Sequence, residues 1–96
     1  MVDFSKFKEE PGVYCITHKE TGKQYVGKSI DVRRRVYFHT FLSKRAIQVS
    51  HIARALAKHG IDAFEFSVLE YTATKAEAGD AEIKWITKLG TFEAGY

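Results

Sequence analysis

With 96 residues, the chain has the usual length of one domain and can build one modest hydrophobic core. Its 45% hydrophobic and 28% charged residues are typical of a globular protein, which excludes a disordered chain, and no apolar run reaches the roughly 20 residues that a bilayer requires. The net charge of +3 gives a mild bias toward polyanions, while the single cysteine, Cys15, excludes an internal disulfide and favours an intracellular, reducing compartment.

The first part of the chain predicts a β-hairpin. Residues 1–10 lack an apolar signal core and are expected to be a loose lead-in to one domain over 11–96. Residues 12–18 and 24–29 are rich in Val, Ile, Thr and Tyr, and Glu20-Thr21-Gly22 between them has the composition of a turn.

Two helices are expected next. Ser29 or Asp31 can cap a helix that runs to about Ser43. Ser50 can cap a second helix that ends at Gly60, a residue suited to the position after a helix.

The last third of the chain predicts a strand and a helix. Residues 64–72 alternate apolar and polar side chains, as a strand with one buried face does. Thr74 and Glu77 have the spacing of a capping box, and the helix they begin runs to Leu89 before Gly90. The order ββααβα indicates an α+β fold, with a small, mostly antiparallel three-stranded sheet flanked by three helices.

Two charged residues fall where the helical periodicity demands apolar ones. Arg35, together with His39, lies in the middle of the apolar arc of the first helix, so we expect it to face the sheet while Arg33 and Arg34 face water; the arc consists of Val32, Val36, Phe38 and Leu42. Glu82 lies near the centre of the arc of the third helix, which consists of Ala78, Ala81, Trp85, Ile86 and Leu89. A buried charge needs a partner, so these residues form either a structural Arg35–Glu82 pair or part of an active site.

The hairpin brings two tyrosines together. With a turn at residues 19–22, Tyr14 lies opposite Gly27 and Tyr25 opposite Ile16, which puts both phenols on one face. Gly27 is then expected to leave space beside Tyr14 for a substrate. Ordinary packing on a sheet face is the alternative explanation for the two tyrosines.

Phenols, cations, an imidazole and a carboxylate suit phosphodiester hydrolysis. A metal ion on Glu82 would polarise the phosphate, a phenol or imidazole would relay a proton, and cations would stabilise the transition state. A single carboxylate with water and phosphate oxygens is a common way to hold Mg²⁺. The four histidines and Cys15 lack the spacing of zinc ligands.

The motifs GVY at 12–14 and YVG at 25–27, with Arg35 ten residues after Tyr25 and His39 one helical turn later, resemble the signature of the GIY-YIG endonuclease family. The segments HIARALAKHG, FEFSVLE and AEIKWITKLGT resemble later blocks of that family, so the resemblance covers residues 12–96.

This resemblance implies a nuclease that depends on Mg²⁺ (or Mn²⁺) and uses a single-metal mechanism. By position, Glu82 would bind the metal ion, Tyr14 and Tyr25 would position or deprotonate the water, Arg35 would hold the phosphate, and His39 would relay protons. Either tyrosine could be the general base.

Two further positions relate the chain to branches of the family, and a third departs from the family's pattern. Lys28 matches a lysine of excision-repair nucleases, and His39 is closer to the homing and phage branch. The family's asparagine after the terminal Gly-Tyr has no counterpart after Tyr96. The chain is therefore expected to be either the catalytic part of a longer protein with a downstream DNA-binding domain, or a small standalone nuclease.

Two functions remain open. The first is a DNA endonuclease in which Arg33, Arg34, Lys44 and Arg45 grip backbone phosphates without reading sequence. The second is an inactive nucleic-acid-binding module of the same fold. Metal-dependent turnover would distinguish them. Nicking or double-strand cleavage, DNA preference and oligomeric state stay open.

Overall fold

The computed structural model describes residues 4–42 and 51–90, apart from the side chains of 4, 38–42, 51 and 53. The elements in chain order are β1 (Gly12–His18), β2 (Gln24–Ser29), α1 (Val32–Leu42), α2 (His51–His59), β3 (Phe64–Tyr71) and α3 (Lys75–Leu89), with short 3-10 helices at Phe4–Lys6 and Ile61–Ala63. The order ββααβα is the predicted one.

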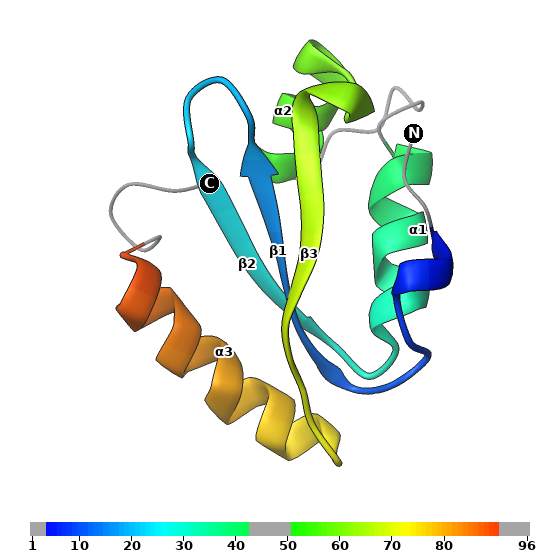
Figure 1. The fold of residues 1–96 in the computed structure, drawn as a ribbon, viewed down its shortest axis with the longest axis vertical. Helices are drawn as coiled ribbons and strands as arrows, with labels where there is room; N and C mark the ends of the chain where they lie inside the picture. The colour runs from blue at the N-terminus through cyan, green and yellow to red at the C-terminus, as the bar shows by residue number, and fades with distance from the viewer. Residues whose placement is uncertain (1–3, 43–50, 91–96) are drawn as a thin grey trace.

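The strands form one antiparallel sheet in the order β2-β1-β3, so β1 lies in the middle and β2 is an edge strand. Helices α1 and α2 cover one face of this sheet, and α3 covers the other (Figure 1). The fold is therefore α+β, as predicted. None of the described helices combines the length and hydrophobicity needed to span a membrane.

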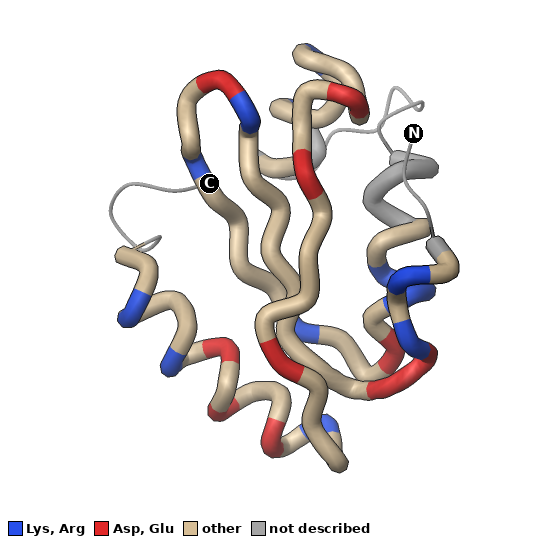
Figure 2. Tube along the Cα trace, in the orientation of Figure 1, with Lys and Arg blue, Asp and Glu red and all other residues tan. Residues whose placement is uncertain are grey.

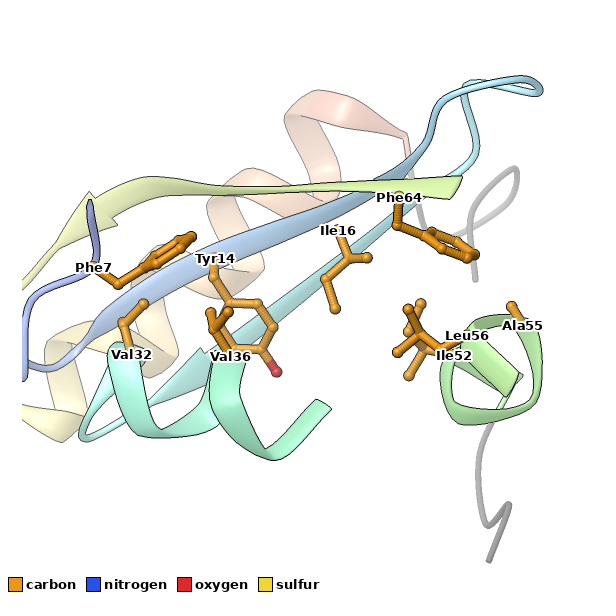
Figure 3. Close-up of a cluster of buried hydrophobic side chains, with 9 residues drawn as sticks. All are labelled: Phe7, Tyr14, Ile16, Val32, Val36, Ile52, Ala55, Leu56 and Phe64. Carbon is orange, nitrogen blue, oxygen red and sulfur yellow. The ribbon is translucent and has the colours of Figure 1, made fainter. Parts of the chain in front are cut away.

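The larger core lies between the sheet and the pair α1 and α2. Tyr14 and Ile16 alternate along β1 toward this face, because every second residue of a strand points the same way. Val32 and Val36 of α1, and Ile52 and Leu56 of α2, are each four residues apart and pack against this face, as Figure 3 shows. The buried cluster consists of Phe7, Tyr14, Ile16, Val32, Val36, Ile52, Ala55, Leu56 and Phe64.

The opposite face of the sheet packs against α3. Val13 and Val26 meet Ala81 there, and half-buried apolar residues surround them: Leu69, Trp85, Ile86 and Leu89. The helix begins as predicted, since the Thr74 hydroxyl accepts a hydrogen bond from the Glu77 amide, and it ends before Gly90 in the left-handed conformation.

The N-terminal segment differs from the expected loose lead-in over its described part, 4–10. Phe7 is only 6% exposed and belongs to the core. The carbonyls of Glu10 and Lys8 accept hydrogen bonds from the amides of Val32 and Arg33, the first residues of α1. One aromatic anchor in a charged stretch is therefore enough to hold this segment on the fold.

The hairpin has the predicted register, with Tyr14 opposite Gly27 and Ile16 opposite Tyr25. The expected free space at Gly27 does not exist, because the Tyr14 ring itself fills it: a Cβ atom at Gly27 would lie 2.5 Å from Tyr14 Cζ. At the start of β1, a Cβ atom on Gly12 would lie 2.5 Å from the Glu70 carbonyl oxygen. Both glycines serve close packing of neighbouring groups.

Candidate active site at the edge of β2

The two tyrosines meet on the face that carries α1 and α2. Their ring centroids are 6.2 Å apart with the rings tilted by 42°, and the phenols are joined by a hydrogen bond. Tyr14 is 2% exposed and its hydroxyl points toward α1 and α2 (Figure 3), whereas Tyr25 is half-buried on the edge strand. The pair thus reaches from the core to the surface.

Burial raises the pKa of the Tyr14 phenol far above its usual value, and the neighbouring Tyr25 adds to the shift. Arg35 lowers the same pKa and Glu82 raises it, so both charges act on the Tyr14 hydroxyl. The hydrogen bond with Tyr25 also raises the pKa of Tyr14, as expected when Tyr14 is the donor. Tyr14 therefore keeps its proton at neutral pH.

Arg35 does not face the sheet as predicted. Its side chain is exposed, and the buried side chains nearby on α1 are those of Val32 and Val36. A guanidinium cannot give up its charge, so the helix turns Arg35 to the rim of its buried stripe. From the rim it still acts on Tyr14 and lines a cavity at the end of β2.

This cavity bridges the two sides of the sheet. Its volume is about 230 Å³, and it is lined by Lys28, Ser29, Ile30, Arg35, Lys75 and Ala78. Lys28 and Ser29 end β2, Arg35 comes from α1, and Lys75 and Ala78 come from α3. Among the described residues, three cations and no carboxylate line it, so its chemistry favours an anion.

Glu82 lies one helical turn beyond Ala78 on α3. Its side chain is half-buried, and within the described residues its carboxylate forms no hydrogen bond or ion pair. Elsewhere, ion pairs join Arg33 with Glu9 and Lys84 with Glu70. The structural Arg35–Glu82 pair is therefore not formed.

Two comparisons agree with this geometry. The family model of the GIY-YIG catalytic domain matches residues 10–96. The catalytic domain of the homing endonuclease I-TevI is 29% identical and superimposes with a TM-score of 0.78, over 91% of this chain and 96% of that one. A variant of the same domain, an intron endonuclease with one glutamate replaced by alanine, gives a TM-score of 0.79 and 29% identity over 91% of each chain. A search of curated proteins found no match.

The chain belongs to the GIY-YIG family. Its fold is that of the I-TevI catalytic domain, and the family and the structural neighbours support a nuclease function.

A larger cavity beside α1 has a different character from the groove at the end of β2. It measures about 660 Å³ and contains two arginines, Arg34 and Arg35, against two carboxylates, Glu9 and Asp31. Asp31 is the N-cap of α1, because its Oδ1 accepts a hydrogen bond from the Arg34 amide. Balanced charge makes this larger cavity less suited to a phosphate than the smaller groove.

The remaining predicted site residues are placed only in part. Arg33 is exposed and lies 3.8 Å from Glu9, so its charge is already partly balanced. His39 belongs to α1, but its side chain lies outside the described part of the chain, as do Lys44 and Arg45 entirely. Their roles in a GIY-YIG site stay predictions.

Lys75 is the groove residue that sequence reasoning missed. It stands at i, i+3, i+4 and i+7 spacing with Ala78, Gly79 and Glu82, so one face of α3 carries all four. The Lys28 ammonium also lies against this face, since a Cβ atom on Gly79 would be 3.5 Å from Lys28 Nζ. The same spacing rule applied to Glu82 would have found Lys75.

Proposed function

We propose that the chain is an endonuclease that hydrolyses DNA phosphodiester bonds and depends on a divalent metal ion, Mg²⁺ or Mn²⁺. The observation that carries this proposal is the meeting, at the edge of β2, of a cation-lined groove, a phenol pair and a half-buried carboxylate. The family membership and the I-TevI neighbours support nuclease chemistry.

The residues fit one hard metal ion. In the described part of the chain, no three side chains of His, Cys, Asp or Glu gather to form a metal site of their own. Glu82 offers a carboxylate without a protein partner there, and Mg²⁺ is commonly bound by one or two carboxylates with water and phosphate oxygens. When bound, such an ion polarises the phosphate and lowers the pKa of its water.

The groove cations hold the phosphate. Lys28, Arg35 and Lys75 project from three different elements into a volume of about 230 Å³, where they neutralise the phosphate oxygens. Hydrolysis adds negative charge to the phosphorus centre, and fixed cations stabilise that charge more than the ground state.

The tyrosines divide their tasks. Tyr14 keeps its proton because burial raises its pKa, so it acts as a neutral donor that holds Tyr25 in position. Tyr25 is half-buried, and its phenol oxygen accepts a hydrogen bond from the attacking water. The proton relay assigned to His39 by the family resemblance remains part of this proposal.

Cleavage of supercoiled plasmid DNA tests the proposal. The native chain should nick plasmid with Mg²⁺ and stop when EDTA is added. Glu82→Gln, which removes the charge while keeping the shape, should abolish nicking without unfolding α3. Glu77→Gln is the matched control, since Glu77 is exposed on the same helix and glutamine also suits its position in the cap.

The same assay separates neighbouring arginines. Arg35→Ala should lower the single-turnover rate by roughly 100-fold or more, as expected for loss of a group that stabilises transition-state charge. Arg33→Ala should leave that rate nearly unchanged, because Arg33 pairs with Glu9. Tight DNA binding by the native chain without any cleavage would instead favour the binding module, and equal losses for both arginines would contradict the role of Arg35.

A further inference from the structure

A second group of cations lies at the other end of the hairpin. A cavity of about 410 Å³ opens between the β1–β2 turn and α2. Its lining residues are His18, Glu20, Thr21, Lys23, Arg54, Ala55, Lys58 and His59. We call this the turn cavity. None of its described lining residues belongs to the groove at Lys28 and Arg35.

Packing fixes the walls of the turn cavity. The His18 ring lies 4.7 Å from His59 and 4.9 Å from Phe64 between ring centroids, which holds the end of β1 against α2. His18 Nδ1 lies 2.7 Å from the Thr21 hydroxyl oxygen, and the Gly22 amide donates to the His18 carbonyl. The turn is therefore held in one place relative to the helix.

The charge of the turn cavity is positive. Arg54 and Lys58 are four residues apart, so they lie on one exposed side of α2, next to the stripe that buries Ala55. Lys23 faces them from the turn, and among the described lining residues Glu20 is the one carboxylate. Cations that share a cavity repel each other, and an anion between them removes that repulsion. The cavity beside α1, with two cations and two carboxylates, lacks this imbalance.

The two cationic sites stand at opposite ends of β2. Lys23 precedes the strand and Lys28 lies near its end, five residues later, which corresponds to about 17 Å along an extended chain. Figure 2 shows basic residues at both ends of the hairpin and none in the middle of its strands. One strand of B-DNA advances about 3.4 Å per nucleotide, so the spacing matches about five base pairs.

We propose that the turn cavity binds a backbone phosphate of the DNA substrate, about five base pairs from the phosphate held by Lys28 and Arg35. This inference rests on the proposed function, because it assigns the second contact to the same DNA. The contact reads no sequence, since it involves phosphate oxygens alone. It fixes the direction of the duplex along the β2 edge and thereby presents one phosphate to the groove.

The test is the double variant Arg54→Ala with Lys58→Ala. Alanine favours helix, so α2 is retained, which circular dichroism checks. The matched control is Lys6→Ala with Lys8→Ala, which removes the same charge from the N-terminal segment, where Lys8 lies over the Tyr71 ring of the opposite edge strand, β3. Binding of a 20-base-pair duplex is measured by fluorescence anisotropy in EDTA, so that DNA stays intact, over a range of salt concentrations.

At about 0.1 M salt, the affinity of the α2 variant for DNA should be lower by a factor of roughly five or more. The slope of log K against log salt concentration should be smaller in magnitude by about one to two. With DNA below saturation, the variant's single-turnover nicking rate should fall by about the same factor as its affinity, because the lost contact helps to hold the duplex at the groove. Unchanged binding, a loss no larger than that of the control, or no DNA binding by the native chain would each overturn the inference. If binding shifts but the native chain never nicks plasmid, the contact stands and the proposed nuclease function fails.

Discussion

The two faces of the sheet are packed in different ways. On the face of α1 and α2, large side chains such as Ile16 and Leu56 are fully buried. On the face of α3, the buried helix residues are the small Ala78 and Ala81, while Trp85 and Ile86 are half-buried. The first face holds most of the core, and the second lets α3 lie close to the edge of β2.

The side chains that stabilise the fold and the charged groups of the candidate site therefore come partly from different faces of the sheet. Tyr14 belongs to the tightly packed face, and Glu82 belongs to a helix that packs on the other face. They act on each other electrostatically at the edge of β2, where Lys28 lies next to α3. Small residues on α3 thus bring charged groups near the tyrosines without burying them completely.

The largest effect on stability is expected in the core beneath α2. Leu56→Ala should cost about 2–5 kcal/mol of unfolding free energy, because Leu56 is fully buried and leaves a cavity. Ile86→Ala, on the looser face, should cost less than half of the Leu56 value because its side chain is already partly in water. Urea denaturation of both variants measures this. Equal costs would show that the two faces contribute alike.

A smaller effect on stability is expected at the contact between Tyr14 and Gly27. Gly27→Ala should destabilise the fold by about 1–3 kcal/mol and impair nicking, because the new methyl group displaces the Tyr14 ring. Gly79→Ala is the control on the α3 face: its methyl group has room, and alanine should stabilise the helix by about 0.5–1 kcal/mol. A tolerated Gly27→Ala would mean that the phenols are not held by close packing.

The smallest expected effect concerns pH. The folded state keeps Tyr14 neutral because burial raises its pKa, while the unfolded chain ionises this phenol near pH 10. Below pH 10, Tyr14 is neutral in both states, so its ionisation does not lower the free energy of unfolding. Above pH 10, the unfolded chain ionises first, and the free energy of unfolding falls by about 1.4 kcal/mol at pH 11. Tyr14→Phe lacks this loss, so the stability of the native chain should fall more steeply between pH 9 and 11. Parallel curves would contradict a buried, neutral Tyr14.

The sequence predicted the elements and the hairpin register because both depend on local patterns. Alternation along β1 and the turn at Thr21-Gly22 place Tyr14 opposite Gly27 without knowledge of the helices. The capping residues Asp31 and Thr74 also act locally, and both cap as expected.

The failures concern how elements meet. Helical periodicity gives the angle between Val36 and Arg35, but not how the helix is rotated against the sheet, and a small rotation moves Arg35 from the core to the rim. The space at Gly27 depended on a side-chain rotamer of Tyr14, and the attachment of the N-terminal segment depended on Phe7 finding the core. All three depend on tertiary contacts, for which the local sequence carries no signal.

The N-terminal segment also closes one end of α1 to anions. The free amides at the start of a helix often bind anions, helped by the helix dipole. In α1, the amides of Val32 and Arg33 are bound to the carbonyls of Glu10 and Lys8, and the Arg34 amide is bound to the Asp31 carboxylate. The positive end of this helix is therefore closed to ligands. At α1, anion affinity must therefore come from charged side chains such as Arg35, which makes it sensitive to ionic strength and adjustable by single substitutions without any change in the backbone.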